Sequence, residues 1–187
     1  EFHDARETAA LLGIPYHVAD FRREFEAEIV RPFVLEYLSG QTPSPCVLCN
    51  VRMKFDRLAR LAEEVGASHV ATGHYARVSR DETTGRHLLL RARDAGKDQA
   101  YFLFGLDQAQ LEKAVFPLGD WTKDQVRALA RSHGLPVAEK SESQEICFIP
   151  DGDYAAFVER HHAGTAGSAN PFSPGQIVDT EGCVLGR

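Results

Sequence analysis

The alternation of helical and strand-like segments is the feature that most restricts the fold of this chain. Residues 46–65 carry apolar side chains at spacings of three and four, which predicts an amphipathic helix. Gly66 ends this helix, and residues 68–72 (Ser-His-Val-Ala-Thr) follow as a predicted buried strand. A shorter helix and strand are predicted before it, at 4–12 and 15–18. Because helices that alternate with strands pack onto parallel sheets, we predict an α/β fold with a parallel sheet covered by helices.

The remaining elements are predicted from the same periodicities and from breaker residues. A helix is expected at 22–38 with a bend at Pro32, followed by a loop at 39–45. A hairpin is expected at 75–92 with its turn at Thr84–Gly85. Further helices are expected at 99–106, 108–114, 123–133 and 153–161.

The end of the chain has a different composition. Residues 163–174 are small, polar and rich in breakers, which indicates a linker. Residues 176–185 alternate and turn at Glu181–Gly182, as in the first hairpin of a second, mostly β domain. We therefore predict a main domain at 1–162, a linker at 163–174 and the start of a truncated β domain at 175–187.

Composition indicates a folded, soluble, cytoplasmic protein. The chain is 43% hydrophobic and 26% charged, and no apolar run approaches the roughly 20 residues that span a bilayer. The first residues do not resemble a signal peptide, so no membrane partner is expected. The net charge of −6 argues weakly against a nucleic-acid partner. Six basic and three acidic residues fall between Arg77 and Lys97, and charge alone favours a solvated hairpin face there.

The cysteines are candidates for chemistry. Cys46 and Cys49 follow Pro45, which fits a first helical turn, and their spacing places both thiols on one face of that turn. A helix N-terminus lowers the pKa of a thiol and favours the reactive thiolate. The pair fits catalysis, ligation of a metal or cluster, or simple packing. Cys147 precedes Phe-Ile-Pro, and this segment alone predicts a buried cysteine in a short strand. Cys183 has no further signature.

Two other segments place polar residues where ligands commonly bind. Gly73 and His74 follow a predicted strand, and open α/β sheets bind ligands beyond the carboxyl ends of their strands. Lys97 and Asp98 precede a predicted helix, where Asp98 suits an N-cap and Lys97 suits a phosphate. The aromatic residues that follow suit base stacking, but their density favours the core: Tyr101, Phe102 and Phe104.

Five motifs, in this order and spacing, resemble those of the bacterial and organellar tRNA-specific 2-thiouridylases. They are T-P-x-P-C-x-x-C-N-x-x-x-K-F at 42–55, A-T-G-H-Y-A-R at 71–77, K-D-Q-x-Y-F-L at 97–103, F-P-L-G at 116–119 and S-Q-E-I-C-F-I-P-x-G-D-Y at 143–154. The resemblance runs from about Asp4 to Gly186. It implies an adenine-nucleotide α-hydrolase-like (Rossmann-like) domain of the PP-loop type, with helices on both faces of a parallel sheet, then a small central domain and a β-barrel.

The resemblance also implies an activity, that of a tRNA-uridine 2-sulfurtransferase acting on the wobble uridine. The family uses ATP and Mg²⁺ to adenylate the uridine C2 oxygen, which turns a poor leaving group into AMP. Cys147 matches the cysteine that carries a persulfide, charged by a sulfur-relay protein. Cys49 matches the second catalytic cysteine, which helps to release the sulfur and ends in a disulfide with the first.

Binding roles follow from the resemblance in the same way. Gly73 matches an ATP contact and His74 a tRNA contact, while a tRNA-binding segment matches Lys97, Asp98 and Gln99. The stretch that meets the target base matches Ser44, Pro45 and Cys46. Some members have Asp, a proposed general acid/base, where this chain has Cys46, so that a thiol either takes over proton transfer or does something else. Ser44 replaces the commoner Asn.

The 187 residues contain no phosphate-cradling glycine loop, neither a Walker A pattern nor Ser-Gly-Gly-x-Asp-Ser. We therefore expect a fragment that lacks the PP-loop and the C-terminal barrel and that alone does not adenylate tRNA. One alternative keeps tRNA thiolation but uses an iron–sulfur cluster held by Cys46, Cys49 and Cys147. The other is a non-catalytic metal-binding or tRNA-binding module.

Overall fold

The computed structural model describes residues 2–140, 145–163, 172 and 175–186. The chain divides into two compact units. The first comprises Glu1–Arg31 and Ser44–Glu142, and the second comprises Pro32–Pro43 and Ser143–Arg187. Each unit is described by itself below.

The N-terminal part of the chain is helical where the periodicity predicts it. Helix α1 spans Phe2–Leu12 and ends at Gly13, whose φ of 65° suits a residue without Cβ. A second helical run covers the predicted 22–38 as three segments: α2 (Arg22–Phe25), the π-helical η1 (Glu26–Val30) and α3 (Arg31–Leu38). The bend predicted at Pro32 stays a prediction, but the turn that precedes this proline is π-helical. Proline cannot donate to the carbonyl of residue 28 and its ring crowds that carbonyl, which a wider turn relieves.

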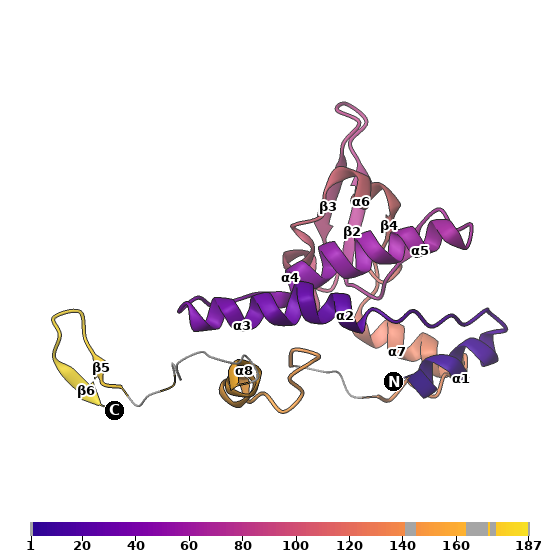
Figure 1. Cartoon of the computed structure of the whole chain (residues 1–187). Helices are drawn as coiled ribbons and strands as arrows, with labels where there is room; N and C mark the ends of the chain where they lie inside the picture. Colours follow the sequence, from indigo (N-terminus) through magenta and orange to yellow (C-terminus); the bar gives the residue numbers. More distant parts are fainter. Residues whose placement is uncertain (1, 141–144, 164–171, 173–174, 187) are drawn as a thin grey trace. The chain divides into compact units, whose positions relative to one another are not determined.

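The helix that carries the paired cysteines is also confirmed. It consists of α4 (Pro45–Leu48), the π-helical η2 (Cys49–Arg57) and α5 (Leu58–Glu64). Gly66 ends it at φ 77°, where the Ala67 N–H donates to the Ala62 carbonyl at 2.7 Å. Figure 1 shows this helix lying across the strands of the first unit.

The strands of the first unit form two small sheets. β1 (Val70–Ala71) pairs in parallel with β4 (Ala114–Val115), and β2 (Ala76–Arg80) pairs with β3 (His87–Arg91) in an antiparallel hairpin. The hairpin and its turn at Gly85 (φ 71°) were predicted and are confirmed. The parallel pair confirms the α/β class, although β4 was not foreseen because two residues are too few to show a period.

Helices α6 (Gln108–Lys113) and α7 (Lys123–Ser132) complete this unit, and each begins with a reciprocal capping box. The predicted helix at 99–106 is only the short 3₁₀ helix η3 (Ala100–Leu103). The core joins the cysteine helix to β1, β2, η3, α6 and β4 through Phe55, Val70, Ala76, Leu103, Leu106, Leu111 and Ala114. Burying a side chain such as Phe55 contributes about 1.5–3 kcal/mol.

The strand predicted at 15–18 is wrong in this structure. Residues 14–20 are irregular, and Ile14, Tyr16 and Val18 are exposed. A strand needs a neighbour to accept and donate its backbone hydrogen bonds, and among the described residues no strand pairs with this segment. The alternation of its side chains is therefore not enough to form a strand.

In the second unit, the ring of Phe33, on α3, lies 5.3 Å from that of Phe148 and 6.0 Å from that of Phe157, on α8 (Tyr154–Ala163). β5 (Ile177–Val178) and β6 (Val184–Gly186) form the predicted hairpin, with Gly182 at φ 86°. Most of the predicted linker, residues 164–171 and 173–174, lies outside the described residues. Within the part of the chain that the structure describes, no helix is long and apolar enough to cross a membrane.

Candidate functional site

The start of the cysteine helix is built as its sequence predicts. Pro45 occupies the first turn and is buried, and Ser44 precedes it with φ −116° and ψ 78°. The Cys49 N–H donates to the carbonyls of Pro45 and Cys46, which ties the two cysteines into one turn. Both cysteines are half-buried, and neither is in a disulfide. The motif thus presents two thiols at the beginning of a 20-residue helical run.

Asn50, which follows Cys49, was not singled out in the sequence. Its side chain is 2% exposed, and its Nδ2 donates to the carbonyl of Phe102 at 2.8 Å. Three residues after Phe102, an added Cβ at Gly105 would lie 3.0 Å from the side chain of Val51, which follows Asn50 on the cysteine helix. The buried asparagine therefore holds the segment after Lys97-Asp98-Gln99 against the cysteine helix. Its position directly after the C-x-x-C pattern was the available signal.

Lys97, Asp98 and Gln99 lie beside the end of the β2–β3 hairpin. The Asp98 carboxylate accepts the Ala92 N–H at 2.8 Å and the Arg91 Nε–H at 3.2 Å. Partial burial opposes ionisation of Asp98, but these bonds and one from the Ala100 N–H outweigh it, so its pKa is lowered. Gln99 Oε1 accepts the Tyr75 N–H at 3.0 Å, and Lys97 is half-buried. Asp98 and Gln99 thus brace the start of η3.

Gly73 and His74 follow the carboxyl end of β1, as predicted, but differ in exposure. Gly73 is exposed, whereas His74 is only 8% exposed and packs beside the rings of Phe55 and Phe116, with centroids 6.4 and 6.1 Å away. A histidine at a strand end is more often a surface residue, but His74 is buried. The His74 ring is buried because it packs against the side chains of Phe55 and Phe116.

His74 holds a lysine that sequence reasoning missed. Its Nε2 lies 3.4 Å from Lys54 Nζ, and its Nδ1 lies 2.7 Å from Thr72 Oγ1. An ammonium group can only donate, so Nε2 accepts, and Nδ1 carries the proton and donates to Thr72. Burial first, and the Lys54 charge second, lower the pKa of His74 to about 4. A neutral histidine thus fixes a cation beside the strand end.

Cys147 belongs to the second unit and is exposed, so the expected buried strand is wrong. It lies in a turn, where the Ile149 N–H donates to the Ile146 carbonyl at 2.8 Å. Ile149 is 1% exposed, and Phe148 packs against Phe33. These two apolar residues fill the core, which leaves the thiol of Cys147 at the surface. Ser143 and Gln144 of the same motif lie outside the described residues.

The predicted site residues are thus distributed over both units. The first unit holds Ser44, Pro45, Cys46, Cys49, Gly73, His74, Lys97, Asp98 and Gln99, and the second holds Cys147. Among the described residues, no group of three or more His, Cys, Asp or Glu side chains is arranged to hold a metal ion.

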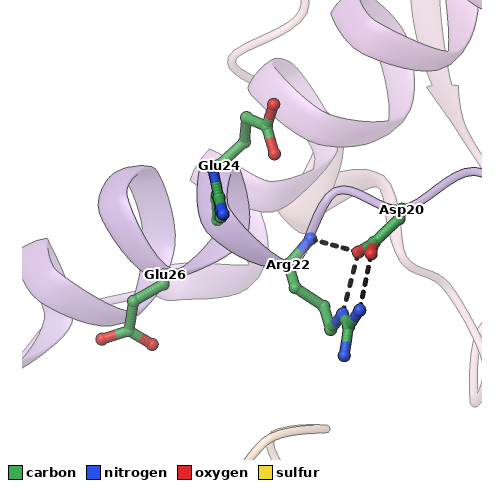
Figure 2. Close-up of a pocket in the computed structure, with 5 residues that line it drawn as sticks. Asp20, Arg22, Glu24 and Glu26 are labelled. Atoms are coloured by element: carbon green, nitrogen blue, oxygen red, sulfur yellow. Dashed lines mark hydrogen bonds and ion pairs between the residues drawn. The ribbon is translucent and has the colours of Figure 1, made fainter.

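A surface pocket lies elsewhere on the first unit (Figure 2). It is lined by Asp20, Arg22, Arg23, Glu24 and Glu26. The Asp20 carboxylate pairs with the Arg22 guanidinium at 2.7 and 2.9 Å, and this bond lowers the pKa of Asp20 to about 2. The pocket is lined by three acidic and two basic side chains, and it contains none of the predicted site residues.

The parallel strand pair and the helix packed on it define an α/β domain. The sequence profile of the tRNA methyl transferase HUP domain matches residues 1–151. The chain belongs to this family.

Several curated relatives match the whole chain. Proteins named tRNA-specific 2-thiouridylase MnmA are 55% identical in Solibacter usitatus and 50% identical in Acidobacterium capsulatum. A protein of the same name from Geobacter metallireducens is 52% identical. In each comparison the match covers 100% of this chain and 49–50% of the relative. The chain therefore spans about half the length of the relatives that it matches.

Proposed function

We propose that the complete protein carrying this chain thiolates the wobble uridine of tRNA at C2. The proposal is supported by the relatives that bear this name and by the exposed thiol of Cys147 within its matching motif. The family description mentions methyl transfer, whereas the relatives are named for thiolation. Two matched cysteine motifs favour sulfur, because one thiol must carry sulfane sulfur and another must release it.

ATP with Mg²⁺ supplies the activation of the uridine C2 oxygen in this proposal. Gly73 fits a nucleotide contact because it is exposed at a strand end and an added Cβ there would meet only the Leu118 side chain, at 3.9 Å. The 187 residues contain no loop that would cradle the phosphates. We therefore expect the 187-residue chain alone not to adenylate tRNA.

In this proposal, two cysteines carry out the transfer of sulfur to the uridine. The terminal sulfur of a Cys147 persulfide attacks C2 of the activated uridine, and the activated oxygen leaves with AMP. The Cys49 thiolate then attacks the Cys147 sulfur, breaks its bond to the transferred sulfur and leaves that sulfur on the base. Each turnover produces 2-thiouridine and a Cys49–Cys147 disulfide, which an external thiol must reduce. A sulfur-donor protein recharges Cys147, and we place the reaction in the cytoplasm.

The remaining matched residues bind the RNA. Ser44, Pro45 and Cys46 meet the target base at the beginning of the cysteine helix, with Cys46 available for proton transfer. Lys97 supplies a positive charge for the backbone, and Asp98 and Gln99 hold that segment in place through their bonds to Ala92 and Tyr75. His74 acts on RNA through Lys54, which it positions at 3.4 Å.

The test is thiolation of tRNA by the complete gene product with ATP, Mg²⁺, a sulfane-sulfur donor that can charge Cys147 and a thiol that reduces the disulfide after each turnover. A mercury-containing gel retards thiolated tRNA. We expect retardation with the wild type and none with Cys147→Ser. Cys183→Ser is the matched control, because Cys183 is also exposed but lies in the β5–β6 hairpin, and it should thiolate normally.

The same gel separates the alternatives. Cys46→Ser should slow the reaction but not abolish it if Cys46 only transfers protons. Complete loss in Cys46→Ser together with visible absorbance in anaerobically prepared protein would favour the iron–sulfur cluster. An intact wild type that thiolates nothing would contradict the proposed function and favour a binding module.

A further inference from the structure

Three aromatic side chains on and next to η3 are at the surface rather than in the core. Tyr101 is 67% exposed, Phe104 65% and Phe102 37%. Their rings contact one another, with centroids 5.6 Å apart for Tyr101–Phe102 and 5.9 Å apart for Tyr101–Phe104. We call these three residues the aromatic platform. An apolar cluster of this kind in water marks a binding surface.

The platform is held rigidly from beneath. Leu103, between its members, is fully buried in the core, and the Phe102 carbonyl accepts the Asn50 Nδ2–H at 2.8 Å. The Phe102 N–H donates to the Gln99 carbonyl at 3.0 Å. The backbone that carries the rings is therefore held in place before any partner binds, which reduces the entropy cost of binding.

The charges beside the platform suit a polyanion. The Arg91 side chain is 75% exposed and contacts Asp98, two residues before η3. Arg93 is exposed and Lys97 is half-buried in the same segment, where Asp94 and Asp98 are the only acids from residue 91 to 98. Residues 91–98 carry three basic and two acidic side chains, a net charge of +1. Exposed aromatic rings that directly follow such a segment in the chain match single-stranded nucleic acid, which combines stacking faces with phosphates. A purely apolar protein segment would gain nothing from the cations.

The position of the platform connects it to the cysteines. Asn50 directly follows Cys49, and an added Cβ at Gly105 would lie 3.0 Å from Val51 and 3.5 Å from Val47 of the same helix. We propose that the aromatic platform stacks unpaired anticodon-loop bases next to the target uridine, and so holds the loop at the cysteine helix. This inference rests on the proposed function for the identity of the RNA.

The test compares RNA affinity and thiolation in the complete gene product. The double variant Tyr101→Leu/Phe104→Leu removes two rings but keeps apolar side chains. Trp121→Leu removes an aromatic residue that is 40% exposed outside the platform. Fluorescence anisotropy is measured with a labelled anticodon stem–loop and with a fully paired RNA of equal charge. Circular dichroism verifies that each variant is folded.

Loss of stacking is expected to weaken binding of the stem–loop by at least about fivefold in the double variant. Trp121→Leu should bind like the wild type, and the paired RNA should not distinguish the proteins. Equal stem–loop affinity in the double variant and the wild type would overturn the inference. So would a change of oligomeric mass in the double variant without a change in RNA affinity, because the platform would then cover a second copy.

The thiolation gel separates this inference from the proposed function. Wild-type thiolation with unchanged stem–loop binding in the double variant would leave the function standing and remove the platform. Platform-dependent stem–loop binding by a wild type that thiolates nothing would support the platform and contradict the function.

Discussion

The ring of His74 is buried within 3.4 Å of the Lys54 Nζ, so that protonating it would place two positive charges side by side. Its pKa is about 4 in the folded chain, against an ordinary value of 6.5. Between these values the unfolded chain binds a proton that the folded chain does not. The free energy of unfolding that depends on a neutral His74 is therefore fully present above pH 6.5, and it is lost as the pH falls towards 4. At pH 4.5 the loss reaches about 2–3 kcal/mol.

Replacing His74 by Gln should remove this pH dependence, because the amide can accept from Lys54 and donate to Thr72 without titrating. Urea denaturation at pH 7.5 and at pH 4.5 measures the free energy of unfolding of each variant. The wild type should lose about 2–3 kcal/mol more than His74→Gln on acidification. His17→Gln, an exposed histidine in the irregular segment, should behave like the wild type. Parallel curves for wild type and His74→Gln would contradict the buried neutral histidine.

At the scale of elements, a helix or strand could be predicted from the sequence when enough of its residues repeated one pattern of apolar side chains. The stripe of the cysteine helix and the five paired positions of the β2–β3 hairpin were readable because each extends over several repeats. β4, with two residues, has no period to read. The error at 15–18 and the exposed rings of η3 have another cause. Pairing and burial depend on what packs against a segment, and neither Tyr16 nor Tyr101 carries that information locally.

Gly119 gives a test of packing at this scale. An added Cβ would lie 2.1 Å from the Ala76 carbonyl oxygen on β2, where only backbone movement could relieve the clash. Gly119→Ala should therefore lower the free energy of unfolding by about 1–3 kcal/mol. Gly96→Ala is the control, because its nearest neighbour is the Asp94 side chain at 3.5 Å. Equal denaturation midpoints for the two variants would contradict this prediction, because the backbone at Gly119 would then move to accept a Cβ at no cost in stability.

At the scale of the whole molecule, the proposed chemistry needs residues from both compact units. The motifs identified Cys46, Cys49 and the segment 97–99, and the structure places them in one unit through contacts that involve Asn50 and Gly105. The supporting residues Asn50 and Lys54 were missed because their roles arise from partners 52 and 20 positions away. Cys147 was recognised only through its motif, since its exposure results from Phe148 and Ile149 turning into the core of the second unit.

The most direct measurement is a single turnover of the complete gene product, with its persulfide preloaded and no external reductant. Peptide mapping by mass spectrometry identifies the disulfides, and the mercury gel counts the thiolated tRNA. We predict one Cys49–Cys147 disulfide for each thiolated tRNA, with Cys46 and Cys183 still reduced. Thiolated tRNA accompanied by reduced Cys49 and Cys147, or by a disulfide between Cys46 and Cys49, would contradict sulfur transfer from a Cys147 persulfide.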